Sequence, residues 1–143
     1  MKKTSFPTPQ DAEKAFYEAF EACSLNAMMA IWAEDEEILC IHPTGSRLCG
    51  YNAIKEGWQQ IFESGVQLRF HLLNQQFLRG MSLSVQSVME HIFVGEENAP
   101  RPPIIATHVF MLTASGWRMV VRHASLSPEA SMKLAEIQTG TLH

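Results

Sequence analysis

The chain has 143 residues and a net charge of −4, and no run of it approaches the roughly 18 apolar residues that span a bilayer. This length suits one domain that buries its own hydrophobic core without help from a metal or a disulfide. The eleven Lys and Arg residues are scattered and form no basic stripe, which argues against nucleic-acid binding. Three cysteines without CxxC spacing indicate a reducing compartment, so we expect a soluble cytoplasmic protein.

The first half of the chain predicts three helices. Thr8 supplies a capping hydroxyl ahead of a proline at the first helical position, which predicts a helix from Pro9 to about Cys23. Ser24 is a second cap and begins a helix that we expect to reach Trp32. A third helix is predicted from Tyr51 to Glu63, because its large apolar residues share one face: Ile54, Trp58, Ile61 and Phe62.

Four strands follow after Gly65. The runs are rich in apolar and β-branched residues, are separated by Gly and Pro, and predict an antiparallel meander. One earlier short strand is expected at Glu37–His42. We therefore predict one α+β domain over residues 1–143, with a core at about 9–127 and a helical C-terminal tail at 128–143.

The third strand of this meander has no polar face. One side carries Ile104, Ala106, His108, Phe110 and Leu112, and the other carries Ile105, Thr107, Val109 and Met111. A sheet with one face in water should alternate polar and apolar residues. We infer that one face packs on the helices and the other on a second copy of the sheet, as a homodimer.

Two segments carry a resemblance to a known family: "AIWAEDEEILCIHPTGSRLCGYNAIKEGWQQIF" and "ATHVFMLTASGWRMVVRHAS". In their order and motifs they resemble the NTF2-like superfamily, most of all its SnoaL-like branch, from about Pro9 to Ser127. The resemblance implies a cone in which a strongly curved antiparallel sheet wraps three N-terminal helices, with a ligand pocket between them. It also implies pairing of two sheets back to back, but the fold alone names no reaction.

His42 is the candidate catalytic residue. The resemblance places it, just before Pro43-Thr44-Gly45, where ketosteroid isomerases carry an acidic general base. An imidazole with a pKa near 6.5 suits proton transfer at neutral pH. The alternative is structural: the imidazole bonds a carbonyl of the turn and packs on the helix that carries Trp58.

The isomerase reaction also needs a tyrosine and a protonated acid that stabilise an oxyanion. The resemblance puts Phe16 at the tyrosine position, with Tyr17 one residue away on a different helix face. The strand that should supply the acid offers Thr107 and His108 instead. We therefore do not expect steroid isomerase chemistry.

Histidines lie on four different strands, at His71, His91, His108 and His123. They would bind a metal only if their faces converged, which strand alternation does not indicate, so we predict no metal and no cofactor. Glu90 is costly to bury unpaired, and its candidate partners are His108, Arg122 and His123.

The tryptophans Trp32, Trp58 and Trp117 are interpreted as core anchors, with Trp58 alternatively lining the pocket mouth and stacking on a flat ligand. The sequence thus predicts a pocket that either binds a small apolar or aromatic molecule or is vestigial. The alternative is a lyase- or isomerase-like enzyme with His42 as its base. The candidate ligand-binding residues are Tyr17, Trp32, Trp58, Glu90, His108, Arg122 and His123.

Overall fold

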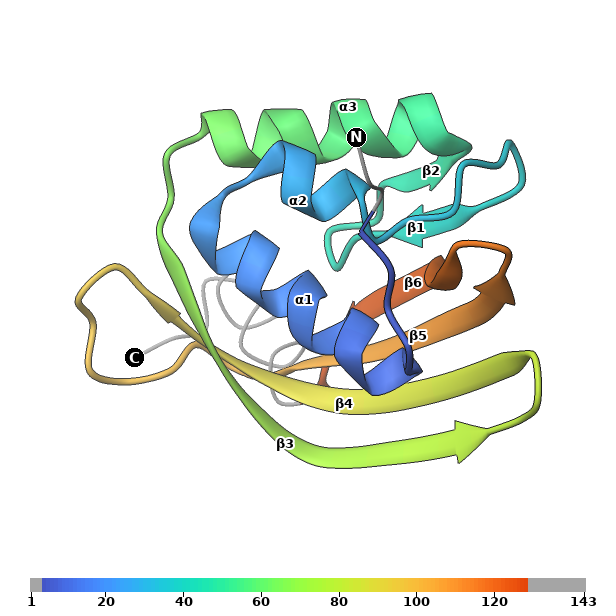
Figure 1. Cartoon of the computed structure of the whole chain (residues 1–143). Coiled ribbons are helices and arrows are strands. Elements are labelled where there is room, and N and C mark those ends of the chain that lie inside the picture. The colour runs from blue at the N-terminus through green and yellow to red at the C-terminus, as the bar shows by residue number, and fades with distance from the viewer. Residues whose placement is uncertain (1–3, 129–143) are drawn as a thin grey trace.

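The computed structural model of the protein describes residues 4–128, in which three helices lie against one face of a six-stranded sheet (Figure 1). The predicted tail at 128–143 lies outside the described residues, except for Pro128. The elements in chain order are α1 (Pro9–Ala22), α2 (Leu25–Met29), β1 (Leu39–Ile41), β2 (Arg47–Cys49), α3 (Tyr51–Glu63), β3 (Leu68–Arg79), β4 (Leu83–Val94), β5 (Ile104–Thr113) and β6 (Gly116–Leu126).

The first helix begins and ends where its sequence signals predict. Thr8 Oγ1 accepts a hydrogen bond from the Asp11 backbone N–H at 3.0 Å, and the helix ends at Cys23, whose φ of 52° is left-handed. The bounds of α3 are those predicted. Helix α2 is shorter than predicted because Ile31 and Ala33 make backbone hydrogen bonds with Met119 of β6 instead of continuing the helix.

The strands form one sheet in the order β2-β1-β6-β5-β4-β3, and β3 to β6 make the predicted antiparallel meander. One pair departs from the expected antiparallel sheet: β1 runs parallel to β6, with Leu39 opposite Val121. A parallel pair is possible here because β2, α3 and β3 to β5 lie between β1 and β6 in the chain, so the two strands are not joined by a hairpin.

Strand β2 was not predicted, since only Leu48 of its three residues is a large apolar side chain. It forms a hairpin with β1 across the Pro43-Thr44-Gly45 turn. The backbone of His42 closes this turn, because its N–H donates to the Ser46 carbonyl and its carbonyl accepts from the Gly45 N–H.

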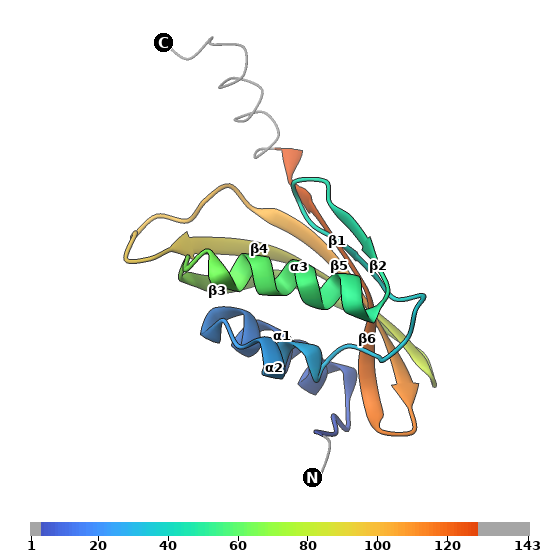
Figure 2. The ribbon, with the colours of Figure 1, turned by 90° about the horizontal axis from the view of Figure 1, so that it is seen from above.

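The sheet curves around the helices (Figure 2). Irregular pairing between Leu73 and Gln76 and between Val109 and Phe110 interrupts the ladders, and such bulges bend strands. The even-numbered residues from 84 to 90 in β4 and from 104 to 110 in β5 are buried and face the helices, so the sheet has a distinct inner and outer face.

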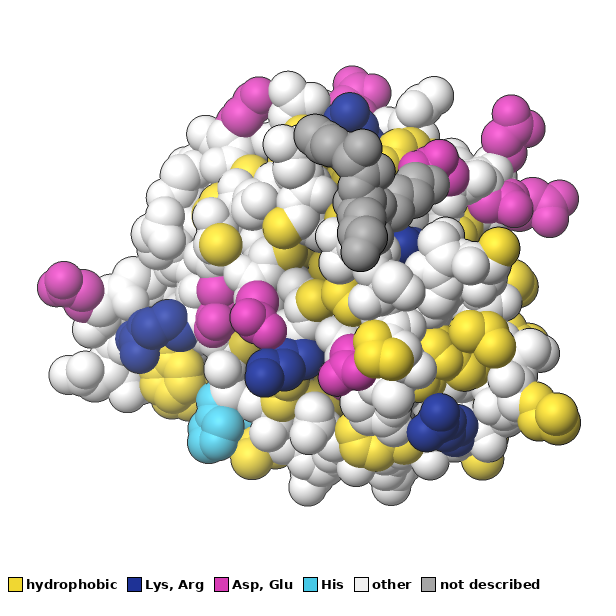
Figure 3. Space-filling view, in the orientation of Figure 1, with side chains coloured by type: hydrophobic (Ala, Val, Ile, Leu, Met, Phe, Trp, Pro, Cys, Tyr) yellow, Lys and Arg dark blue, Asp and Glu magenta, His cyan; other side chains and the backbone are white. Residues whose placement is uncertain are grey.

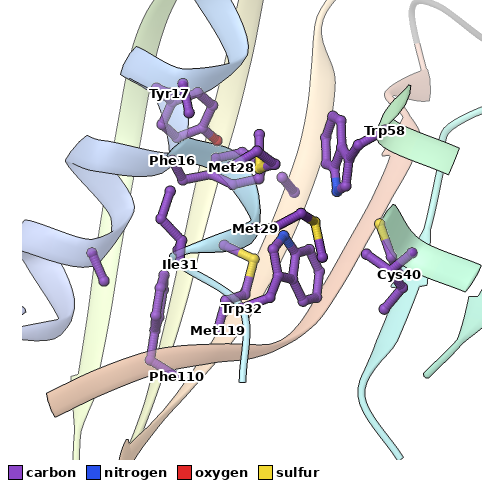
Figure 4. Close-up of a cluster of buried hydrophobic side chains, with 14 of the residues drawn as sticks. Phe16, Tyr17, Met28, Met29, Ile31, Trp32, Cys40, Trp58, Phe110 and Met119 are labelled. Carbon is purple, nitrogen blue, oxygen red and sulfur yellow. The ribbon is translucent and has the colours of Figure 1, made fainter. Parts of the chain in front are cut away.

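The hydrophobic core lies between the helices and the inner face of the sheet (Figure 4). The predicted anchors Trp32, Trp58 and Trp117 are all buried there. The Trp58 ring contacts Phe16 edge-on at a centroid distance of 5.7 Å, a favourable aromatic geometry. Within residues 4–128, none of the helices combines the length and the apolar character that crossing a membrane requires.

Candidate functional site

A continuous set of buried polar side chains joins α1 to the inner face of the sheet. Glu90 of β4 accepts two hydrogen bonds on Oε2, from Tyr17 Oη at 2.5 Å and from Arg122 Nη1 at 2.7 Å. Nη2 of Arg122 donates to Oε1 at 3.2 Å, so the guanidinium binds the carboxylate in a bidentate manner. His108 lies between Arg122 and Glu13. We call these five residues the polar network.

The geometry fixes the protonation of His108. Its Nε2 lies 2.8 Å from Arg122 Nη1, and because a guanidinium only donates, Nε2 must accept. The hydrogen is therefore on Nδ1, which donates to Glu13 Oε2 at 2.8 Å. Burial lowers the pKa of His108, in keeping with this neutral imidazole.

Arg122 keeps Glu90 ionised. Burial alone would raise the pKa of Glu90, but the charge and hydrogen bonds of Arg122, together with the Tyr17 hydroxyl, lower it below the usual value. Burial and the negative charge of Glu90 raise the pKa of Tyr17 well above its usual value, so the phenol stays protonated. The phenyl rings of Phe16 and Phe20 cover the guanidinium, with Cζ 5.1 and 5.9 Å from their centroids.

A cavity of about 770 Å³ lies between α3, the β1–β2 hairpin and the inner face of the sheet. Its wall is mainly apolar and includes Phe20, Leu48, Ile61, Leu68, Ile92 and Ile104. Exposed polar residues, among them Ser46, Glu56 and Gln60, also line it. Glu90 and Arg122 are its most buried lining residues, with 0% and 2% of their surfaces exposed, and form its closed end.

His42 follows β1 directly and lines this cavity. Its ring meets Trp58 edge-on at a centroid distance of 5.2 Å, and its Nε2 lies 3.8 Å from Cys40 Sγ. Burial and the charge of Arg122 lower the pKa of His42 to about 4. The imidazole is therefore neutral at neutral pH, while the hydrogen bonds of the turn are made by the backbone of His42.

Gly57 of α3 shapes the cavity beside His42. A Cβ added there would lie 2.4 Å from Leu48 Cδ1 and 3.8 Å from His42 Nε2. Only a glycine therefore lets α3 approach the β1–β2 hairpin this closely without displacing Leu48.

The remaining predicted site residues lie in four different places. Tyr17 and His108 are behind the closed end of the cavity, where they hold Glu90 and Arg122. Trp58 is a core residue, with 0% of its surface exposed, and lies behind the cavity wall, where it contacts His42 and Phe20. Trp32 lines a separate hollow of about 480 Å³, and His123 is exposed on the outer face of the sheet.

The strand histidines do not converge. His71 and His91 are paired opposite one another, and like His123 they are not among the buried residues of the inner face, whereas His108 is. Across residues 4–128, no three His, Cys, Asp or Glu side chains gather in a way that could hold a metal ion.

Sequence reasoning missed Glu13, although it precedes Phe16 and Tyr17 by three and four residues and so shares their buried helix face. It also missed that Tyr17 meets a buried carboxylate, Glu90. In this pair the pKa of Glu90 is lowered and Tyr17 donates its proton to the carboxylate, whereas the isomerase reaction uses a protonated acid.

Residues 10–129 match the family model for the SnoaL-like domain, which covers most of the chain. This protein belongs to the SnoaL-like domain family. The resemblance to the NTF2-like superfamily that was drawn from the sequence is thereby confirmed.

Solved structures resemble this SnoaL-like chain closely. A candidate calcium/calmodulin-dependent protein kinase type II association domain from Thiobacillus denitrificans is 43% identical, with a TM-score of 0.78 over 87% of this chain and 98% of that one. A candidate dehydratase of the NTF2-like family from Streptomyces avermitilis is 24% identical, with a TM-score of 0.73 over 81% of this chain and 91% of that one. The predicted α+β cone is confirmed by these neighbours.

A curated relative is the F-box protein SKIP8 of Arabidopsis thaliana. It is 26% identical over 113 residues, which are 78% of this chain and 46% of that protein. The SnoaL-like chain thus spans less than half the length of this relative.

Our first prediction concerns the buried ion pair. Arg122→Met should lower the free energy of unfolding by roughly 3–5 kcal/mol, because it leaves the Glu90 carboxylate buried without a cation. Urea denaturation measures the loss. Adding Glu90→Gln to the same chain should recover part of it, and a double variant no more stable than the single one would contradict this account.

The second prediction concerns pH. The folded pKa of His42, about 4, lies below the value near 6.5 of an unfolded chain, so only the unfolded state gains this proton between those pH values. The contribution of the neutral His42 to the free energy of unfolding is fully present above pH 6.5 and is lost as the pH drops towards 4. His42→Gln should therefore gain stability relative to the wild type as the pH is lowered from 7 to 5.

Urea titrations at pH 7, 6 and 5 test this. Leu48→Ala, a neighbouring change without a titrating group, is the control and should shift stability equally at each pH. A His42→Gln difference that stays constant with pH would contradict the prediction.

Proposed function

We propose that this SnoaL-like protein is a binding module that holds a small, mostly apolar or aromatic molecule in its cavity, with His42 as the polar contact. The observation that carries this proposal is the cavity of about 770 Å³, which is walled by apolar side chains and contains one half-buried imidazole. Pockets of this size with few polar groups are typical of small-molecule sites.

Binding fits the polar groups better than catalysis does. The charges of Glu90 and Arg122 are matched against each other, and the Tyr17 proton is donated to Glu90. A pKa of about 4 makes His42 a weak base, whereas an effective general base has a pKa near the working pH. The cavity therefore offers a ligand a hydrogen bond more readily than a proton transfer.

The alternative function is a lyase- or isomerase-like enzyme in which His42 is the general base. In its favour, the imidazole is neutral at neutral pH and lines the cavity, so it is able to accept a proton from a bound substrate. Measured turnover of a bound molecule, lost in His42→Ala, would establish this alternative.

The third prediction tests the binding function. A thermal-shift screen of uncharged apolar and aromatic metabolites should give a hit, and a ligand at 100 times its dissociation constant adds about 2.7 kcal/mol of stability. His42→Ala should weaken that ligand about tenfold, the loss expected for one hydrogen bond, and leave the melting temperature of the free protein nearly unchanged. His123→Ala, on the outer face, is the matched control and should bind like the wild type. No hit at millimolar concentrations would contradict the proposal.

We also propose that the chain forms a homodimer through the outer faces of its sheet. Large apolar side chains are exposed there, including Leu78 at 75% and Val85 at 37%, which lie opposite one another on β3 and β4. Leu83 and Met111 form a second exposed pair across β4 and β5. Figure 3 views the molecule from the helix side and shows further apolar side chains at the lower right, around the hairpin that joins β3 to β4.

Two further observations support the proposals on assembly and location. The relative from Thiobacillus denitrificans is named an association domain, and its sequence is 43% identical. The cysteines Cys23, Cys40 and Cys49 are free thiols, which is in keeping with a reducing, cytoplasmic location.

The fourth prediction tests the dimer. Light scattering should give twice the mass of the 16.1 kDa chain at micromolar concentration, as an interface burying upwards of roughly 2,000 Å² would ensure. Val85→Glu places a charge in the middle of this face and should give a folded monomer. Gln59→Glu, on the exposed side of α3, should remain a dimer. A wild-type monomer would refute the proposal.

A further inference from the structure

We infer that the cavity selects uncharged ligands and rejects carboxylates, an inference that rests on the proposed binding function. Among residues 4–128, Arg122 is the one cation that lines the cavity, and its charge is already matched by Glu90 inside the protein. A carboxylate that entered would lose its hydration and find no cation to replace it.

The closed end of the cavity exposes little of the Arg122 guanidinium to a ligand. Three of its five N–H groups are engaged: both on Nη1, with Glu90 and His108, and one on Nη2, with Glu90. Nε has no hydrogen-bond partner among the described residues, but it is itself buried. Since only 2% of the Arg122 surface is exposed, a ligand meets the pair as a neutral, already hydrogen-bonded unit.

The other charges nearby are negative. Glu56 is exposed along the cavity wall, and Glu13 lies behind the closed end on the far side of His108. Within residues 4–128, the cavity lining contains no Lys and no Arg apart from Arg122. Counting Glu56, Glu90 and Arg122, its formal charge is negative, which repels an anion before it reaches the apolar wall.

His42 completes the selection. As a neutral imidazole it donates from one ring nitrogen and accepts on the other. It therefore matches the hydroxyl of an alcohol, the oxygen of a ketone or the amide of a carboxamide. The ligand class that fits is an uncharged molecule with an apolar body and one such hydrogen-bonding group.

Matched probe pairs test this inference on the wild-type protein at pH 7.5. The pairs are phenylacetamide with phenylacetate and 3-phenylpropanol with 3-phenylpropanoate, which are similar in shape and differ in charge. Calorimetric titration should show the uncharged member of each pair binding at least tenfold more tightly. Carboxylates that bind as tightly as their partners overturn the inference and leave the binding function standing. If neither member of either pair binds at millimolar concentration, the proposed binding function itself fails.

A charge variant tests whether the matched charges of Arg122 and Glu90 cause the rejection of carboxylates. Glu90→Gln keeps the shape of the side chain but leaves the Arg122 charge unmatched. The affinity of the carboxylate probes should therefore rise at least tenfold relative to that of their uncharged partners. Glu96→Gln makes the same chemical change on an exposed loop away from the cavity. It should leave the ratio of the affinities for uncharged and charged probes as in the wild type. An unchanged ratio in Glu90→Gln overturns the role given to the pair.

If Glu90→Gln does not fold, Glu56→Gln provides the test on an exposed residue. It removes one negative charge from the cavity wall and should narrow the ratio between uncharged and charged probes. A ratio that does not narrow overturns the inference.

Discussion

The buried contact between Arg122 and Glu90 is the constraint on which the rest of the structure depends. Taking both charges out of water costs free energy, and this cost is offset by their mutual attraction together with further hydrogen bonds to both groups. Tyr17 and Glu13 of α1 help to supply these hydrogen bonds, the latter through His108. The first helix is thus held at one place on the sheet, because sliding it would leave buried charges without partners.

The same contact determines what the cavity can do. Groups that would otherwise be strong candidates for catalysis are committed to holding the fold together, and the cavity is left with one weakly basic imidazole. A tyrosine next to a buried acid also occurs in steroid isomerases, where the acid is kept protonated by an apolar site. Here Arg122 keeps the acid ionised, so a similar pair of residue types has a structural role.

Local signals in the sequence predicted most of the fold. The cap at Thr8, the apolar face of α3 and the glycines and prolines between the long strands each act over a few residues, and each was confirmed. Long-range effects were not predictable. Helix α2 ends early because the following residues pair with Met119, and β2 forms because β1 is its neighbour, not because its own residues favour a strand.

In the candidate site, too, local sequence signals were predictable and long-range pairing was not. The position of Glu90 in an apolar strand indicated that it needs a buried partner. The choice among His108, Arg122 and His123 depended on strand register and on the bulge in the β5–β6 pairing. The burial of Glu13 was readable from helix spacing alone. The outward position of His123 was not, because a bulge shifts the alternation of every residue beyond it.

The parallel pairing of β1 with β6 has a consequence for the order of folding. Leu39 and Val121 are separated by 82 residues (121 − 39), and contacts of such long sequence separation form late and slowly. His42 is held in place by a hairpin whose only sheet neighbour beyond itself is the last strand. The helices and the four-stranded meander are therefore able to assemble before the cavity exists, and the cavity is completed when the β1–β2 hairpin docks on β6.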